Sequence, residues 1–182
     1  MMNNEQYRRQ SIEAVTIDGL WLEFGVAGGQ SARHILDAGC TELYGFDTFT
    51  GLPEHWYGHH TVGTFTRGGN APQIPGLTCY KGLIQDTLWP FLLDHEGPCA
   101  FVHVDTDLGS AAEFILLTLL EAGRLVDGTI VMFDELAGYP GWQCGEWGAA
   151  VSWLFGNFDC VPVAATTLNG VHKAAYRLYG KI

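Results

Sequence analysis

Short apolar runs that stop at a glycine or an acidic residue alternate with helical segments along most of this chain. The clearest runs, short enough to be buried strands, are Leu20–Val26, Leu43–Phe46, Cys99–Val104 and Thr129–Phe133. Between them, apolar residues recur at helical spacing in Gln30–Ala38 and Ala111–Leu125. This alternation predicts an α/β fold with a doubly wound, mostly parallel sheet. Ligands of such sheets bind beyond the carboxyl ends of the strands, so function is expected there.

Weaker patterns extend the alternation toward the carboxyl terminus. They predict a strand at Thr78–Lys81, helices at Thr87–Asp94 and Glu146–Phe155, and closing strands at Cys160–Ala165 and Ala174–Tyr179. The 182 residues are enough for one domain, which we expect to span residues 1–182. The segment Gly51–Gly76 lacks clear periodicity and is long for a connection, so we interpret it as a lid or substrate loop.

Charge and cysteine content narrow the classes of partner and compartment. Nine Lys and Arg against twenty Asp and Glu give a net charge of −11, which disfavours nucleic acid and anionic membrane as partners. The first ten residues are polar and every apolar run is much shorter than a bilayer span, so we predict neither signal peptide nor transmembrane helix. Five scattered cysteines without a CxxC pair indicate reduced thiols and a cytoplasmic protein.

A glycine-rich turn follows the first predicted strand. Glu23, Gly25, Gly28 and Gly29 form an ExGxxGG pattern in which the backbone can approach a nucleotide-like ligand. About twenty residues later, Asp47 ends the second strand, where a carboxylate can accept hydrogen bonds from ribose hydroxyls. Taken singly, Asp47 could instead cap a turn and Gly25 could simply end a strand. The dinucleotide pattern GxGxxG is absent, which makes NAD the second choice of cofactor.

Acidic residues also follow two later strands. Asp105 and Asp107 come after Cys99–Val104, and Asp134 and Glu135 come after Thr129–Phe133. Four carboxylates at one sheet edge would repel one another without a cation, and hard oxygen ligands suit Mg²⁺ or another divalent ion. We therefore predict Asp105, Asp134 and Glu135 as metal ligands. For Asp107 we favour the alternative that it caps the following helix.

Histidines offer candidate bases for proton transfer. His59 and His60 lie in the long loop and are assigned as candidate catalytic bases, because imidazole titrates near neutral pH. His103 lies within a predicted strand, and we assign it a structural role.

Five segments taken in order resemble the class I S-adenosylmethionine-dependent methyltransferases related to macrocin O-methyltransferase. They are LEFGVAGGQS, YGFDTFTGLPEHW, GTFTRGG, CAFVHVDTDL and GTIVMFDELAGYPGW. The resemblance covers roughly Leu20 to Phe155 and implies a Rossmann-like, mostly parallel seven-stranded sheet. It also implies methyl transfer from S-adenosylmethionine to a hydroxyl of a small molecule, assisted by Mg²⁺ or another divalent cation.

The resemblance implies a role for individual residues as well. Those assigned to cofactor binding are Glu23, Gly25, Gly29, Ser31, Asp47, Thr48, Phe49, Gly82, Leu83 and Asp105. Within this set, Glu23 and Gly25 would follow the methionine portion and Asp47 would hold the ribose. Thr48 and Phe49 would border the adenine, with Gly82 and Leu83 on its other side. Asp105, Asp134 and Glu135 match the metal-binding positions of the family, and Asp105 is also assigned to catalysis.

The chain departs from the family pattern at two places. Leu108 to Ala111 stand where many members have a Tyr-Ser-Ser/Thr sequence, and no lysine follows Asp105 as in catechol-type enzymes. The short segment before the first strand indicates an open site or a homo-oligomer that completes it. Two rivals remain: a NAD-type oxidoreductase, and a non-catalytic module that binds S-adenosylmethionine or a metal.

Overall fold

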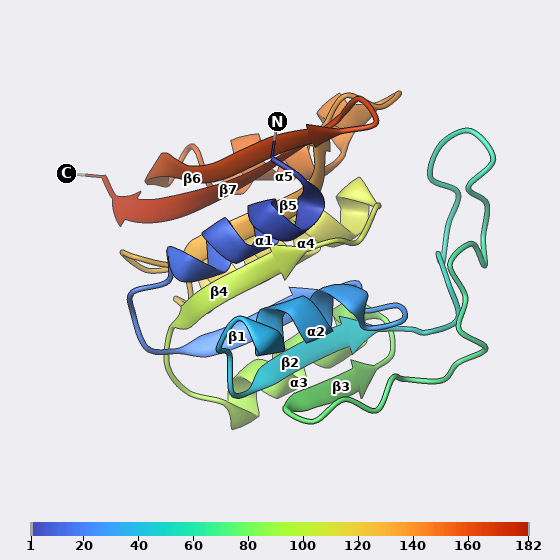
Figure 1. Ribbon diagram of the computed structural model, residues 1–182, viewed down its shortest axis with the longest axis horizontal. Coiled ribbons are helices and arrows are strands. Elements are labelled where there is room, and N and C mark those ends of the chain that lie inside the picture. Colours follow the sequence, from blue (N-terminus) through green and yellow to red (C-terminus); the bar gives the residue numbers. More distant parts are fainter. Residues whose placement is uncertain (1, 182) are drawn as a thin grey trace.

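A single seven-stranded sheet forms the centre of the molecule in the computed structural model, which describes residues 2–181. The strand order is β3-β2-β1-β4-β5-β7-β6 (Figure 1). The strands are β1 (Leu20–Phe24), β2 (Leu43–Asp47), β3 (Leu77–Lys81), β4 (Cys99–Val104), β5 (Ile130–Ala137), β6 (Phe158–Leu168) and β7 (Val171–Gly180). β1 to β5 run parallel, whereas β7 pairs antiparallel with β5 and β6. The predicted doubly wound, mostly parallel sheet is confirmed.

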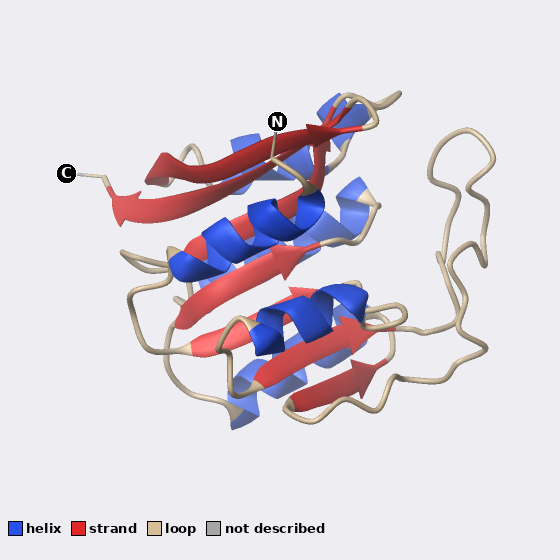
Figure 2. Ribbon diagram, in the orientation of Figure 1, coloured by secondary structure: helices blue, strands red, loops and turns tan. Residues whose placement is uncertain are grey.

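Helices cover both faces of this sheet (Figure 2). One face carries α1 (Asn4–Glu13) and α2 (Gln30–Asp37); the other carries α3 (Ile84–Asp94), α4 (Gly109–Glu121) and α5 (Glu146–Trp153). A short 3-10 helix, η1, covers Trp142–Cys144. Among the described residues, no helix combines the length and hydropathy that a membrane span requires.

The order of the strands reverses between β1 and β4. From β1 the chain builds outward to β2 and β3, and it then returns to add β4 and β5 on the other side of β1. The connections after β1 and β4 therefore diverge, which opens a crevice at the carboxyl ends of these strands. This reversal places the segments that follow β1, β2, β4 and β5 at one edge of the sheet.

Helix α1 was not predicted from the sequence. Asn3 accepts a hydrogen bond from the Gln6 amide, and the Gln6 side chain accepts one from the Asn3 amide, forming a capping box. The helix is anchored where the Tyr7 hydroxyl donates to the Phe133 carbonyl over 2.8 Å. Its mean hydropathy is low, so the pattern of apolar residues gave little sign of a helix that packs against the sheet.

Several element ends differ from the sequence-based expectation. Helix α4 begins at Gly109 rather than at Ala111, and its N-cap residue Leu108 makes no side-chain capping bond. The prediction that Asp107 caps this helix is therefore wrong; Asp107 instead adopts a positive φ of 63° in the turn after β4. The strands β6 and β7 extend beyond their predicted limits at both ends, because each pairs with its neighbour along nearly its full length.

Residues 48–76 contain no helix or strand and extend past the carboxyl edge of the sheet (Figure 1). The base of this loop is held by the Phe49 carbonyl, which accepts from the amides of Arg67 and Gly69. Farther out, Leu52 exchanges backbone hydrogen bonds with Gly63 and Thr64 at 2.9 Å. The segment is thus a folded loop at the edge where ligands are expected, and its role as a lid stays a prediction.

Gly25 permits the close approach of the turns after β1 and β4. Its φ is +90°, and a Cβ placed there would lie 1.8 Å from the Asp105 carbonyl oxygen. Gly39 serves as a control, because it has a φ of +113° but open space where a Cβ would lie. Strain alone should destabilise Gly39→Ala by about 1–3 kcal/mol. The clash should destabilise Gly25→Ala by about 1–3 kcal/mol more, measured by urea denaturation. Equal losses would contradict this role of Gly25.

Candidate active site

A cavity of about 700 Å³ opens at the carboxyl ends of the parallel strands β1 to β5. Its lining includes most of the residues that the sequence assigned to a site. They are Gly25, Ser31, Asp47, Thr48, Gly82, Leu83, Asp105 and Glu135. The loop contributes Leu52, Glu54 and Arg67 to the same cavity. Residues from the ends of all five parallel strands are therefore brought together around one space of a size typical of small-molecule sites.

Other assigned residues do not line the cavity. Gly29 is the buried N-cap of α2, and Phe49 is buried beneath the loop. Glu23 and Asp134 lie in the protein interior, where they belong to a network of charged groups. His59 and His60 lie farther out in the loop.

The turn after β1 is fixed by Asp47. Its Oδ2 accepts from the Ala27 amide and its Oδ1 accepts from the Phe49 amide, each over 2.7 Å. Asp47 thus stabilises both the glycine turn and its own following turn, as the turn-capping interpretation proposed. Because it also lines the cavity, the same carboxylate retains lone pairs that a ligand's hydroxyl groups can reach.

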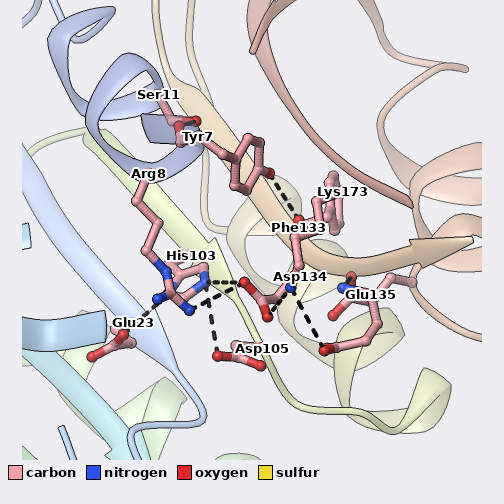
Figure 3. A network of polar contacts seen from close by, with 11 residues as sticks. Tyr7, Arg8, Ser11, Glu23, His103, Asp105, Phe133, Asp134, Glu135 and Lys173 are labelled. Atoms are coloured by element: carbon pink, nitrogen blue, oxygen red, sulfur yellow. Dashed lines mark hydrogen bonds and ion pairs between the residues drawn. The ribbon is translucent and has the colours of Figure 1, made fainter. Parts of the chain in front are cut away.

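A row of buried charged groups crosses the sheet beside the cavity (Figure 3). His103 on β4 contacts Glu23 on β1 through Nδ1, with 3.0 Å between Nδ1 and Oε1. Its Nε2 faces Asp105 at 3.9 Å and Asp134 on β5 at 3.8 Å. Burial alone would lower the pKa of His103, but hydrogen bonding to Asp134 and Glu23 and the nearby carboxylates raise this pKa to about 9. His103 is therefore a buried imidazolium that joins three carboxylates.

Asp134 is surrounded by cations. Lys173 on β7 donates to its Oδ2, and Arg8 on α1 lies 3.4 Å from its Oδ1. Burial opposes ionisation of Asp134, but the hydrogen bond to His103 and the charges of Lys173, His103 and Arg8 lower its pKa well below the usual range. Asp134 is therefore ionised and paired.

The neighbouring acids lack comparable pairing. Burial and the nearby Asp134 raise the pKa of Asp105, and burial together with Asp105 raises the pKa of Asp107 to about 8. Burial and Asp134 likewise raise the pKa of Glu135 to about 8. The buried Glu146 accepts from the Glu135 amide over 3.0 Å, and burial and Glu135 raise its pKa. This edge therefore carries more carboxylates than the adjacent cations neutralise.

The donor set fits a divalent cation. His103, Asp105 and Asp134 have potential ligand atoms within 4.8 Å of one another, and His103 would join them only after losing its Nε2 proton. Glu135 lies beside them, and its buried Oε2 has no hydrogen-bond partner among the described residues. A cation would neutralise the surplus carboxylate charge and supply a partner for that oxygen. Of the three predicted ligands, Asp105 and Glu135 face the cavity, whereas Asp134 already contacts protein cations.

Aromatic residues hold the outer loop against the body. Tyr57 stacks on Tyr139, which follows β5, with ring centroids 5.3 Å apart, and Trp56 contacts the same tyrosine edge-on. His60 packs against Phe65 and Trp56 within this cluster. The structure therefore places the candidate base His60 among aromatic rings outside the cavity lining.

Sequence reasoning missed three basic residues in this region. Arg8 lies in the unpredicted helix α1, Lys173 lies in a closing strand to which no function was assigned, and His103 was assigned only a structural role. One signal was available: Asn3 followed by Gln6 is a capping-box pattern that predicts a helix start. Lys173 gave no such signal, because it precedes the predicted strand Ala174–Tyr179 and falls within β7 only in the structure.

Comparison with solved structures places this fold among methyltransferases. An O-methyltransferase from Bacillus cereus in complex with SAH aligns over 100% of this chain and 83% of that chain, with a TM-score of 0.60 and 13% identity. TomG from Streptomyces achromogenes is an O-methyltransferase involved in tomaymycin synthesis and was solved with SAM. It aligns over 99% of this chain and 82% of its own chain, with a TM-score of 0.60 and 16% identity. An rRNA methylase from Streptococcus thermophilus aligns over 100% of this chain and 99% of its own chain, with a TM-score of 0.55 and 11% identity.

These likenesses establish the Rossmann-like class I methyltransferase fold. No protein-family model matches the chain. No curated protein matches it either. The macrocin-type resemblance therefore stays a prediction.

The acids with raised pKa values predict how stability depends on pH. Asp107 and Glu135 keep their protons up to about pH 8 in the folded metal-free protein, whereas unfolded carboxyls lose theirs near pH 4. The unfolded state thus binds fewer protons between these values, so stability falls as pH rises from about 5 to 8. The raised pKa of His103 acts in the same direction, because its contribution is complete below about pH 6.5 and is lost as pH rises through about 9.

Thermal unfolding of EDTA-treated protein at pH 5, 6.5 and 8 measures this trend. The Tm should fall by several degrees across the series. Glu135→Gln should reduce that fall. Glu121→Gln, which changes an exposed acid at the end of α4, should leave it unchanged. A Tm that is constant or rises with pH would contradict the assignment of buried protonated carboxyls.

Proposed function

We propose that this protein is an S-adenosylmethionine-dependent methyltransferase that methylates a hydroxyl group of a small molecule. The observation that carries this proposal is a cavity at the reversal point of the sheet. There the glycine turn after β1, Asp47 at the end of β2 and the acids after β4 and β5 line one space. The fold shared with structures solved with SAM and SAH supports the same conclusion.

The cofactor's nucleoside would lie between the turns after β1, β2 and β3. Asp47 faces the cavity and would accept hydrogen bonds from the ribose hydroxyls. Thr48, Gly82 and Leu83 line the adjoining wall, where the adenine would lie. Glu23 is fully buried against His103, so we assign it to positioning this histidine rather than to direct cofactor contact.

The charge of the cavity favours a cationic cofactor and a small acceptor. Five acids line it, namely Asp47, Glu54, Asp105, Asp107 and Glu135. A positively charged sulfonium favours ionisation of the acids whose pKa is raised and is stabilised by the resulting carboxylates, whereas a polyanion such as RNA is repelled by the net charge of −11. We therefore propose a small hydroxyl compound as acceptor, although the fold also occurs in an rRNA methylase.

Methyl transfer requires the acceptor oxygen in line with the sulfonium methyl group, at about 3–3.5 Å. Asp105 lies at the junction of the glycine turn and the acidic edge, where its carboxylate can orient the acceptor hydroxyl. A divalent cation held by Asp105 and Glu135, with Asp134 and His103 adjacent, would act as a Lewis acid that lowers the pKa of that hydroxyl. His59 and His60 lie outside the cavity lining, and their role as bases stays a prediction.

Calorimetric titration with S-adenosylmethionine tests the cofactor, with NAD as the parallel ligand. We expect micromolar binding of S-adenosylmethionine and none of NAD. Asp47→Ala should weaken binding roughly 10- to 150-fold, the equivalent of about 1.5–3 kcal/mol for a charged acceptor. Asp37→Ala removes an exposed acid of α2 and should bind normally. Binding of NAD alone would replace this proposal with the oxidoreductase alternative.

Manganese binding tests the cation site independently of turnover. Asp105→Asn and Glu135→Gln should each weaken Mn²⁺ binding by at least about tenfold, measured by calorimetry or electron paramagnetic resonance. Glu121→Gln should not change it. With hydroxyl acceptors, formation of S-adenosylhomocysteine should depend on the cation and fall in both variants. Undiminished Mn²⁺ binding by both variants would remove these residues from the site.

A further inference from the structure

Arg8 reaches the cavity from α1, outside the segments that carry the methyltransferase resemblance. Arg8 is only 8% exposed, and it lines the cavity together with Gly25 and Ser31. Figure 3 shows it approaching Asp134 from the helix above the sheet. This buried arginine therefore belongs to the cavity wall rather than to the outer surface of α1.

The hydrogen-bonding capacity of Arg8 is largely unused. A guanidinium carries five N–H donors. Within the described residues, Arg8 makes one side-chain contact, from Nη2 to Asp134 at 3.4 Å, which is long for a charged hydrogen bond. Its buried Nε has no partner in the described part of the chain. Leaving buried donors of a charged group unpaired is costly, so an additional acceptor is expected at this position.

Pairing with Asp134 does not explain why the positive charge of Arg8 is buried here. Lys173 donates directly to Asp134 Oδ2, and His103 faces Oδ1, so Asp134 has two other cations. Arg8 consequently presents positive charge to a cavity that is otherwise lined by acids, with Arg67 as the other basic residue of the lining. Arg67 is exposed and lies across Gly28 on the loop side. Arg8, in contrast, is buried and is held by α1 at the inner wall of the cavity.

This distribution of charge matches the charged groups of the cofactor's amino acid portion. The sulfonium and ammonium are cationic and suit the acidic edge, whereas the carboxylate needs a cation. Helices α1 and α2 lie on the same face and both begin at the edge where the parallel strands end (Figure 1). Arg8 and Ser31, from these two helices, line the same cavity.

We propose that Arg8 binds the carboxylate of the methionine portion of S-adenosylmethionine. This inference rests on the proposed function and adds α1 to the cofactor site. Arg8 would pair with the carboxylate through the donors that Asp134 leaves free. A side chain already held by its surroundings needs little ordering on binding, which favours affinity.

Ligands with and without the carboxylate provide the test. S-adenosylhomocysteine has it, its decarboxylated analogue lacks only that group, and 5′-methylthioadenosine lacks the whole amino acid portion. Calorimetry on metal-free protein should show that Arg8→Gln weakens S-adenosylhomocysteine binding by at least tenfold, and Arg8→Lys by less. Binding of the two ligands without a carboxylate should stay within twofold. Arg9→Gln, which removes an exposed neighbouring arginine paired with Glu13, should change none of them.

Several results would overturn the inference. Unchanged S-adenosylhomocysteine binding in Arg8→Gln would do so, as would equal weakening of all three ligands, which indicates a structural role. If Arg8→Gln does not fold, the wild-type comparison decides: equal affinity for S-adenosylhomocysteine and its decarboxylated analogue excludes a carboxylate site. A folded wild-type protein that binds none of the three ligands would overturn the proposed function itself, a result distinct from loss of carboxylate selectivity.

Discussion

The carboxylate of Asp134 connects four elements of the fold, and the geometry of the candidate site depends on it. Asp134 is 6% exposed, so its negative charge has to be balanced within the protein. The balancing groups come from α1, β4 and β7 as Arg8, His103 and Lys173. The buried Asp134 carboxylate is stable only when these three cations surround it. This requirement fixes the positions of α1 and of the antiparallel β7 relative to β5. The inner wall of the cavity is set by the same contacts.

The acids at this edge consequently divide into two kinds. Asp134 is paired and ionised, whereas Asp105 and Glu135 face the cavity with raised pKa values. Burial and mutual repulsion among carboxylates cause this difference, since the available cations gather around Asp134. The sequence alone predicted metal ligation for all three residues, and the family resemblance added cofactor binding and catalysis for Asp105. In the structure, the cavity-facing pair makes only longer ion contacts, Asp105 with His103 at 3.9 Å and Glu135 with Lys173 at 4.0 Å, and so retains more coordination capacity than Asp134.

Local patterns in the sequence were sufficient to predict the sheet and the strand ends that meet at the site. The buried parallel strands are continuous apolar runs, and the glycine turn and the acids follow them directly, so their position at one edge followed from the topology. The contacts among Glu23, His103, Asp134 and Lys173 depend instead on the register of β1, β4, β5 and β7, which no local pattern reveals. Helix α1 was missed because its first turns are polar and its buried side chains contact strands far along the chain. The cap expected from Asp107 failed because the backbone turns back at that residue with a positive φ.

The surplus of carboxylates also links ligand binding to protonation. Under the proposed function, a sulfonium entering the cavity brings positive charge beside Asp105 and Glu135, which favours their ionised forms. Ionised carboxylates are the forms that bind a divalent cation, so the cofactor and the metal should each promote binding of the other through the same protons. Arg8 does not oppose this coupling, because its charge would be offset by the cofactor's own carboxylate. The division of charge between Arg8 and the acidic edge therefore allows a zwitterionic amino acid group and a cation to occupy one small cavity together.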